Sequence, residues 1–281
     1  MGANINIGGS TQHNIGHEAK FHTGLTATKL DQFFKSFLEI ENFASIDNSL
    51  NGIQVDNNGA VINKIAFAVD AVMETFERAA AMNAGMLFVH HGLFWGAPLK
   101  IAGNLRQRIK FLLDHNICLY GVHLPLDQHP KYGNNAVLAE LLGLENIEPF
   151  GICHGRKVGY KGTLNEPVSI EEAVKKITFM GRPPLGVFPF GKKEIYSAAI
   201  VSGGASTNAR EAIMDGVDLF ITGESSHSVY HDCLEGKLNM IAGGHYCTEV
   251  WGLHSVMRHC KQELGSNYHI ETDFIDVPTG L

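Results

Sequence analysis

The chain has 281 residues, 44% of them hydrophobic and 18% charged, with a formal net charge of -7 at pH 7. This length can bury one large core or two modest ones. The negative charge argues against electrostatic binding of nucleic acid or anionic membranes. The five cysteines are odd in number and form no C-x-x-C pair, which favours free thiols in a reducing compartment. Neither a signal peptide nor an apolar run of about eighteen residues is present, so we expect a cytoplasmic protein without a membrane span.

The amino-terminal part divides into a polar leader and a first helix. Residues 1–24 are rich in Gly, Asn and His and show no hydrophobic periodicity, which predicts a disordered leader whose histidines belong to no site. Beyond it, apolar residues recur at helical spacing, with Thr28 as the predicted N-cap. We therefore expect a helix that faces the core.

Strands and helices then alternate. Residues 64–70 form a nearly continuous apolar strand, residues 71–84 an alanine-rich helix, and a further strand starts at Met86. A helix over 105–115 and a strand over 117–122 repeat the pattern. Strand, helix and strand with short joints predict βαβ units, whose sheet is covered by helices on both faces.

The strand that starts at Met86 ends in two adjacent histidines, His90 and His91, followed by Gly92. Successive side chains of a strand point to opposite faces, and the glycine makes a bend inexpensive. The pair is thus placed either to bend around one metal ion or to serve two different ions.

Further ligand-type side chains follow other predicted strands. The strand over 117–122 leads to Asp127, and a strand over 239–242 leads into a Gly-Gly loop with His245 and Glu249. Ligands of open α/β sheets gather outside the carboxyl ends of the strands. Three imidazoles and two carboxylates suit zinc, iron or manganese. The candidate ligands are His90, His91, Asp127, His245 and Glu249.

The composition shifts between residues 149 and 195, where glycine and proline become frequent. Short strands around one helix over 170–178 predict a second lobe. We expect residues 25–125 together with 240–281 to form the lobe with the metal site, and residues 126–239 to form the second α/β lobe.

Two features leave alternatives open. The glycine-rich turn at residues 202–206 precedes a helix and either cradles an anion with its backbone amides or is a tight strand-to-helix turn, which is the favoured interpretation. Phe94 and Trp95 either cover a substrate or belong to the core or a subunit interface.

Three motifs together resemble the GTP cyclohydrolase 1 type 2 homologues, also called NIF-three-like proteins. They are His90-His91-Gly-Leu-Phe-Trp, His123-Leu-Pro-Leu-Asp127 and Gly-Gly-His245-Tyr-Cys-Thr-Glu249. The resemblance runs from about Thr28 to the last residue. It implies a two-lobed α/β fold with mixed sheets flanked by helices, a C-terminal segment that returns to the first lobe, a dinuclear metal site and a ring-like homohexamer.

Carried over to this chain, the family's metal ligands fall on His90, His91, Asp127, His245 and Glu249. His123 and Glu224 also match motif positions, and we interpret them as catalytic candidates that support the ligands or transfer protons. His227 is a further candidate for proton transfer.

The resemblance implies two divalent ions per chain and hydrolysis of a small molecule, with GTP as the substrate suggested by the family label. Phosphodiesters and other small metabolites fit such a site equally well. Glu249 or Asp127 would bridge the ions.

Two rival functions belong to other classes. The first is a metal-containing scaffold, in which the ions hold the two lobes together and the ring carries a partner protein. The second is storage or delivery of metal, which predicts weak and exchangeable ions. Five ligands for two ions leave open coordination positions, and these favour catalysis over a purely structural site.

Overall fold

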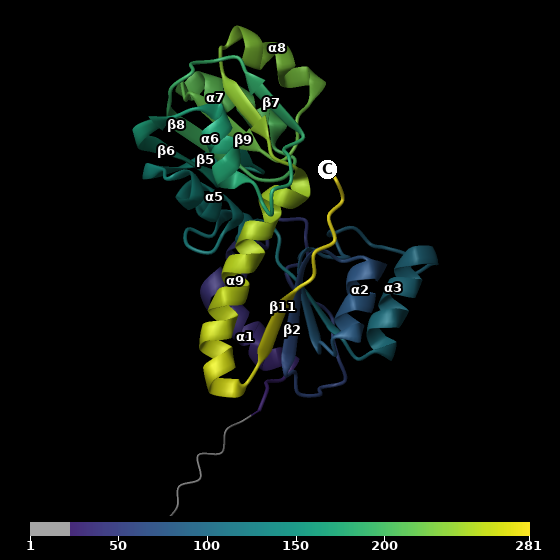
Figure 1. Cartoon of the computed structure of the whole chain (residues 1–281). Coiled ribbons are helices and arrows are strands. Elements are labelled where there is room, and N and C mark those ends of the chain that lie inside the picture. Colours follow the sequence, from purple (N-terminus) through teal and green to yellow (C-terminus); the bar gives the residue numbers. More distant parts are fainter. Residues whose placement is uncertain (1–22) are drawn as a thin grey trace, which may run out of the picture.

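Two β-sheets, one above the other, organise the chain, and the long helix α9 (His245–Tyr268) runs from their junction along the first sheet (Figure 1). The computed structural model describes residues 23–281. Most of the predicted disordered leader lies outside these residues. Gly24, which the prediction included, is held by a hydrogen bond from its backbone N to the Tyr268 carbonyl at 2.7 Å.

The first sheet has the strand order β1-β4-β3-β2-β11 and is mixed, because only β1 runs antiparallel to its neighbour. Its strands are β1 (Gly52–Val55), β2 (Lys64–Asp70), β3 (Met86–His91), β4 (Cys118–Gly121) and β11 (Glu271–Phe274). The helices of this half are α1 (Ala27–Leu38), the 3-10 helix η1 (Ile40–Phe43), α2 (Met73–Ala81), α3 (Gly103–Asp114) and α4 (Leu124–Gln128).

Alternation along β2 explains how both faces of this sheet are covered. Ile65 and Phe67 pack into one cluster with side chains of α1 and α9. The small residues between and after them, Ala66 and Ala68, pack with α2 and α3 on the opposite face. Because strand side chains alternate, one apolar run supplies both cores. The predicted βαβ arrangement follows from this pattern.

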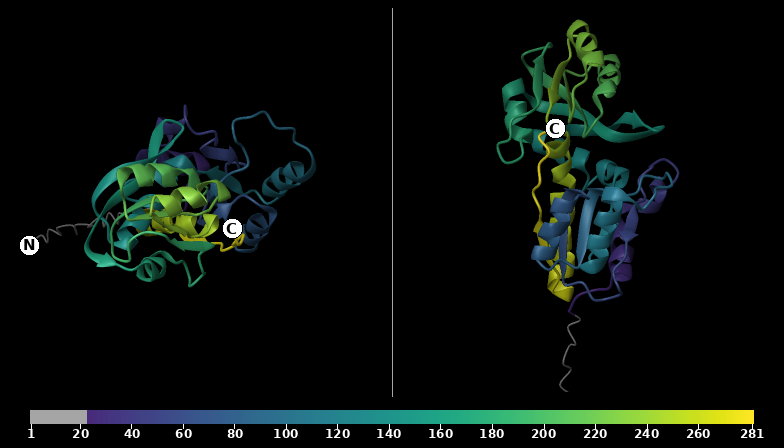
Figure 2. Two further views of the ribbon diagram at one scale, coloured as in Figure 1. Left: turned by 90° about the horizontal axis from the view of Figure 1, so that it is seen from above. Right: turned by 90° about the vertical axis from the view of Figure 1, so that its right-hand side faces the viewer.

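The second sheet has the strand order β5-β6-β8-β9-β10-β7 and is also mixed. Its strands are β5 (Glu145–Cys153), β6 (Arg156–Val168), β7 (Gly186–Pro189), β8 (Ile195–Val201), β9 (Leu219–Thr222) and β10 (Asn239–Ala242). Its helices are α5 (Asn134–Leu142), α6 (Ile170–Ile177), the 3-10 helix η2 (Ser206–Asn208), α7 (Ala209–Asp215) and α8 (His227–Glu235). Figure 2 shows this lobe above the first one, with α9 and the C-terminal segment beside both.

The predicted fold class is confirmed: two mixed sheets flanked by helices, with the C-terminal strand β11 back in the first sheet beside β2. One predicted boundary is displaced. Residues 240–242 were assigned to the first lobe, but β10 pairs with β9 and β7 in the second sheet.

Two helix starts also differ from the prediction. The first helix is capped by Thr26, whose side chain accepts a hydrogen bond from the backbone N of Lys29, and not by Thr28. Helix α9 begins at His245 rather than near Thr248, because Gly244 takes a φ of 97° and lets the chain turn directly into the helix. His245 and Glu249 are therefore one helical turn apart on the same face.

None of the helices in residues 23–281 is long and apolar enough to cross a membrane.

Candidate metal centre

The carboxyl ends of the parallel strands of both sheets meet at the junction between the lobes. β3 ends in His90 and His91, and β4 leads through a short turn to His123 at the start of α4. In the second sheet, β9 leads to Glu224 and β10 leads through two glycines to His245. This is the place where open α/β sheets bind ligands.

All five predicted ligands come together there, with Glu249 in the middle. Its Oε2 atom lies 3.2 Å from Nε2 of His91 and 3.2 Å from Nε2 of His245. Its Oε1 atom lies 3.5 Å from Nε2 of His90, which in turn lies 3.6 Å from Oδ1 of Asp127. The side chain of Glu249 is 4% exposed, so these contacts are screened from water.

The three imidazoles are oriented in the same way. In each ring Nδ1 faces a fixed oxygen acceptor, which makes Nδ1 the protonated nitrogen of the neutral ring and leaves the lone pair on Nε2. This is the usual arrangement of metal-binding histidines. The acceptors are the Val122 carbonyl for His90 at 2.9 Å, Asp70 for His91 at 2.8 Å and Glu224 for His245 at 2.6 Å.

The buried atoms of the cluster lack partners of their own. Nε2 of His90 and Oε2 of Glu249 are buried and have no hydrogen-bond partner. Buried polar atoms are normally satisfied, and here a ring nitrogen and a carboxylate oxygen face the same space. A divalent cation satisfies both, so the donor set fits a metal ion.

Among residues 23–281, three sets of side chains have potential ligand atoms within 4.8 Å of one another. His91, His245 and Glu249 form one set, and His90, Asp127 and Glu249 form the second. Glu249 is common to these two. Within these two sets the adjacent histidines of β3 are separated, although their ring centroids are only 4.6 Å apart; the third set holds both of them together with His123.

The protonation of the cluster shows how strongly it attracts positive charge. Burial alone would lower the pKa of His91, but the charge of Glu249 and the hydrogen bond to Asp70 raise it to about 10. Burial would likewise lower the pKa of His245, yet its contacts with Glu249 and Glu224 raise it to about 9. Burial would raise the pKa of Glu249, but the positive charges of His91 and His90 hold it well below its usual range. Metal binding would displace these protons.

The carboxylate of Asp127 is held by two side chains of the second lobe. Its Oδ1 atom accepts hydrogen bonds from Nδ2 of Asn134 and from Oγ of Ser202, both at 2.9 Å. Asn134 Oδ1 also accepts from the backbone N of Gly252 at 2.7 Å, which ties α5 to α9. The carboxylate is therefore held in place before any ion binds.

His123 lies beside the five ligands. Its Nδ1 atom is 2.9 Å from Oδ1 of Asp47, and its backbone N donates to Asn51. A ring nitrogen of His123 also falls within 4.8 Å of nitrogens of His90 and His91, in the third set. The geometry admits His123 as a ligand in addition to the predicted role in proton transfer.

Sequence reasoning missed the two carboxylates that orient histidines from the first lobe. Asp70 ends β2 directly beside His91 in the parallel register, so its place at a strand end was the signal that pointed to it. Asp47 lies in a loop before β1 and meets His123 across 76 positions of sequence, and no local pattern marks it.

Other candidates lie outside the cluster or have structural roles. His227 is exposed at the start of α8 and belongs to none of the three sets. In the glycine-rich turn, the backbone N of Ser202 donates to Asn135 at 2.7 Å and that of Gly203 donates to Thr248 at 3.0 Å. These two amides are engaged within the protein, which supports the interpretation as a tight turn.

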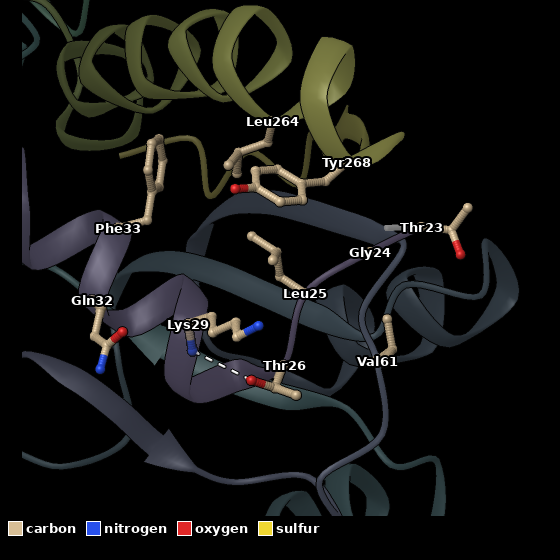
Figure 3. Close-up of a pocket in the computed structure, with 10 residues that line it drawn as sticks. All are labelled: Thr23, Gly24, Leu25, Thr26, Lys29, Gln32, Phe33, Val61, Leu264 and Tyr268. Carbon is tan, nitrogen blue, oxygen red and sulfur yellow. Dashed lines mark hydrogen bonds between the residues drawn. The ribbon is translucent and has the colours of Figure 1, made fainter. Parts of the chain in front are cut away.

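A cleft of about 500 Å³ opens beside the cluster and is lined by ligands, by Trp95 and His123, and by residues of the second lobe. A larger cavity of about 790 Å³ lies at the other end of the first sheet, between the start of α1, the segment before β2 and the end of α9 (Figure 3). None of the described residues that line this second cavity is His, Cys, Asp or Glu. The cleft beside the cluster is therefore the candidate substrate site.

Fold and site together define the class of protein. It is a two-sheet α/β protein with a cluster of histidines and carboxylates where the strands of both sheets end. The family model described as Duf34/NIF3 (NGG1p interacting factor 3) matches residues 25–280. The chain belongs to this family, and the resemblance found in the motifs is confirmed.

Relatives match along nearly the whole chain. A GTP cyclohydrolase 1 type 2 homolog of Treponema pallidum (strain Nichols) is 42% identical over 290 residues, covering 92% of this chain and 100% of the relative. A protein of the same name from Archaeoglobus fulgidus is 43% identical over 250 residues, covering 89% of this chain and 97% of the relative.

Solved structures share the fold. A protein described as ybgI, of unknown function, superposes with a TM-score of 0.81 at 34% identity, covering 92% of this chain and 100% of the other. Reduced HcgD from Methanocaldococcus jannaschii has a TM-score of 0.77 at 26% identity, covering 91% and 100%.

Proposed function

We propose that the protein is a dinuclear metal-dependent hydrolase that acts on a nucleotide or a related small metabolite. The observation that supports this most is the position of Glu249 between two sets of ligands, His91 with His245 and His90 with Asp127. A carboxylate shared by two such sets is suited to bridge two ions. Of the two bridging candidates, Glu249 is favoured over Asp127.

Bound divalent ions would supply Lewis-acid polarisation of the bond under attack and a water acidified toward neutrality. Five protein ligands shared by two ions leave coordination positions for water and substrate. Zinc, iron and manganese all suit this donor set. The protein's own part is to hold the ligands in place, which Asp70, Glu224 and the Val122 carbonyl do through hydrogen bonds to the imidazoles.

Proton transfer falls to His123 and Glu224. Nδ1 of His123 is engaged by Asp47, so Nε2 is the atom that exchanges a proton with a group in the cleft, which His123 lines. One carboxylate oxygen of Glu224 holds His245, while the side chain as a whole is 46% exposed. This carboxylate is therefore in contact with solvent and is placed to carry a proton away from the site.

The family relatives named GTP cyclohydrolase 1 type 2 homologs make GTP the first substrate to test. The proposal includes a ring-like homohexamer and a cytoplasmic location, as the resemblance and the composition imply.

The test is hydrolysis by protein loaded with zinc, iron or manganese, assayed on GTP, other nucleotides and phosphodiesters. We expect His91→Ala and Glu249→Ala to lose bound metal and all activity while keeping the fold. His231→Ala changes an exposed histidine on α8 and serves as the matched control. A variant that loses the metal and retains a confirmed activity would refute the proposal.

A metal-containing scaffold is the second candidate, because residues of both lobes surround the cluster. Direct contacts already join the lobes, among them Asn134 with Gly252 and an ion pair between Arg182 and Asp276. The ions are then not needed to hold the lobes together. We therefore favour catalysis over a scaffold role. A scaffold would be distinguished by loss of its oligomeric assembly when the metal is removed.

A further inference from the structure

Trp95 is a large aromatic side chain exposed beside the cluster. The residue is 38% exposed and lines the cleft. Its ring centroid lies 4.9 Å from that of His123, at an interplanar angle of 78°, and 6.1 Å from that of His91. A ring in this position offers apolar surface within reach of the candidate ligands.

The turn that carries Trp95 is rigidly held. Its indole Nε1 donates to the Gly92 carbonyl at 3.1 Å, and the backbone N of Leu93 donates to Oε1 of Gln54 at 2.6 Å. A side chain at Gly92 would collide with the Gln54 amide, since a Cβ there would lie 2.2 Å from its Nε2 atom. The Phe94 carbonyl accepts from the backbone N of Leu50 at 3.0 Å. The indole is thus a preorganised wall of the cleft.

The described residues of the cleft offer no guanidinium or ammonium group to a polyphosphate chain. None of the described residues that line it is Lys or Arg, and two of them are the carboxylates Asp127 and Glu249. Proteins neutralise phosphate groups with guanidinium or ammonium groups or with free backbone amides. The amides of Ser202 and Gly203 are already engaged.

The wall contributed by the second lobe is uncharged or weakly polar. It includes Ile152, which is 58% exposed, and Cys153 at the end of β5, His154 from the turn that follows, and Thr207 and Asn208. A cleft of about 500 Å³ is large enough for a small heterocyclic molecule.

We propose that this cleft binds a planar heterocyclic group of low charge, such as the base of a nucleoside, stacked on Trp95, and that it does not recognise a polyphosphate chain. This inference rests on the proposed function in placing the substrate in the same cleft. It narrows the substrate class, because GTP then contributes binding through its base and not through its triphosphate.

Tryptophan fluorescence tests the inference directly, because the chain has two tryptophans. In the Trp251→Phe variant Trp95 is the sole indole. Zinc-loaded Trp251→Phe protein is titrated with guanosine, adenosine, cytidine, GTP and ribose 5-phosphate. Base stacking on an aromatic ring tolerates different bases, so a panel of nucleosides is a fair probe.

We expect at least one nucleoside to quench Trp95 and to bind within about tenfold of GTP, a difference of roughly 1.4 kcal/mol at most. Ribose 5-phosphate is expected neither to quench nor to displace the nucleoside. In calorimetry, Trp95→Leu should weaken nucleoside binding about 5- to 100-fold, whereas Trp95→Phe should retain most of it. Both variants should keep the bound zinc.

The inference is overturned if no nucleoside quenches Trp95, if GTP binds far more than tenfold tighter than every nucleoside, or if ribose 5-phosphate displaces the nucleoside. Quenching of Trp95 requires binding but no hydrolysis, so this inference and the proposed function can be refuted independently of each other. Nucleoside binding without any hydrolysis would refute the proposed function alone. Hydrolysis of a non-aromatic substrate without quenching would refute this inference alone.

Discussion

Replacing Asp70 with Asn should weaken the hold on one metal ion and spare the other. Asp70 Oδ1 lies 2.8 Å from Nδ1 of His91, and the two side chains are 24% and 20% exposed. Asparagine keeps the shape and an acceptor oxygen but removes the charge that makes the His91 ring a stronger ligand.

The size of the effect follows from the position of the carboxylate behind the ligand. Loss of such an outer partner costs about 10- to 100-fold in metal affinity, or roughly 1.4 to 2.7 kcal/mol. His91 belongs to the set with His245 and Glu249, whereas the other set contains His90 and Asp127. Competition for zinc with a fluorescent chelator resolves two binding steps, and we expect only one of them to weaken.

The matched control is Asp273→Asn, which makes the same chemical change on β11, where the carboxylate is 57% exposed and lies 3.5 Å from Lys64. Its zinc competition curve should match that of the unmodified protein. Equal weakening of both steps by Asp70→Asn, or no weakening, would refute the reasoning.

Two further predictions concern stability. Phe34 is fully buried, and its ring centroid lies 4.9 Å from those of Phe88 and Tyr120. Phe34→Ala should therefore lower the free energy of unfolding by about 3–5 kcal/mol in urea denaturation. A loss below about 1 kcal/mol would contradict this packing. Burial would raise the pKa of Asp218, but Lys192 and hydrogen bonds from Tyr196 and Ser197 hold it below its usual value of 3.8. Its stabilisation is therefore present above about pH 4 and lost as the pH falls further, so Asp218→Asn should lose less stability than the unmodified protein between about pH 5 and 3. An unchanged acid slope in the variant would count against this assignment.

The sequence was most informative where chemistry and local pattern coincide. The histidine pair ends an apolar strand, so its type, its place and its neighbouring glycine could all be predicted from adjacent residues. The boundaries of α5 (Asn134–Leu142) follow in the same way from apolar spacing and from Gly143, which takes a left-handed φ of 89° at the C-cap.

What the sequence could not predict depends on pairings between distant segments. The contact of Asp70 with His91 needs the parallel register of β2 and β3, and that of Asp47 with His123 needs the loop before β1 to fold over α4. Local sequence does not mark strand β5 either, because most of its residues are exposed and no apolar alternation results. The exposed ring of Trp95 could not be distinguished from a core or interface residue by its type alone.

The most direct test of the central claim is the metal content per chain, measured by elemental analysis on protein purified without chelators under low oxygen. We predict about two ions per chain for the unmodified protein and for His231→Ala, and less than one for Glu249→Gln, because Glu249 belongs to both ligand sets. Circular dichroism confirms that each variant is folded. Less than one ion in the unmodified protein, with no uptake of added zinc, iron or manganese, would contradict the account, as would two ions retained by Glu249→Gln.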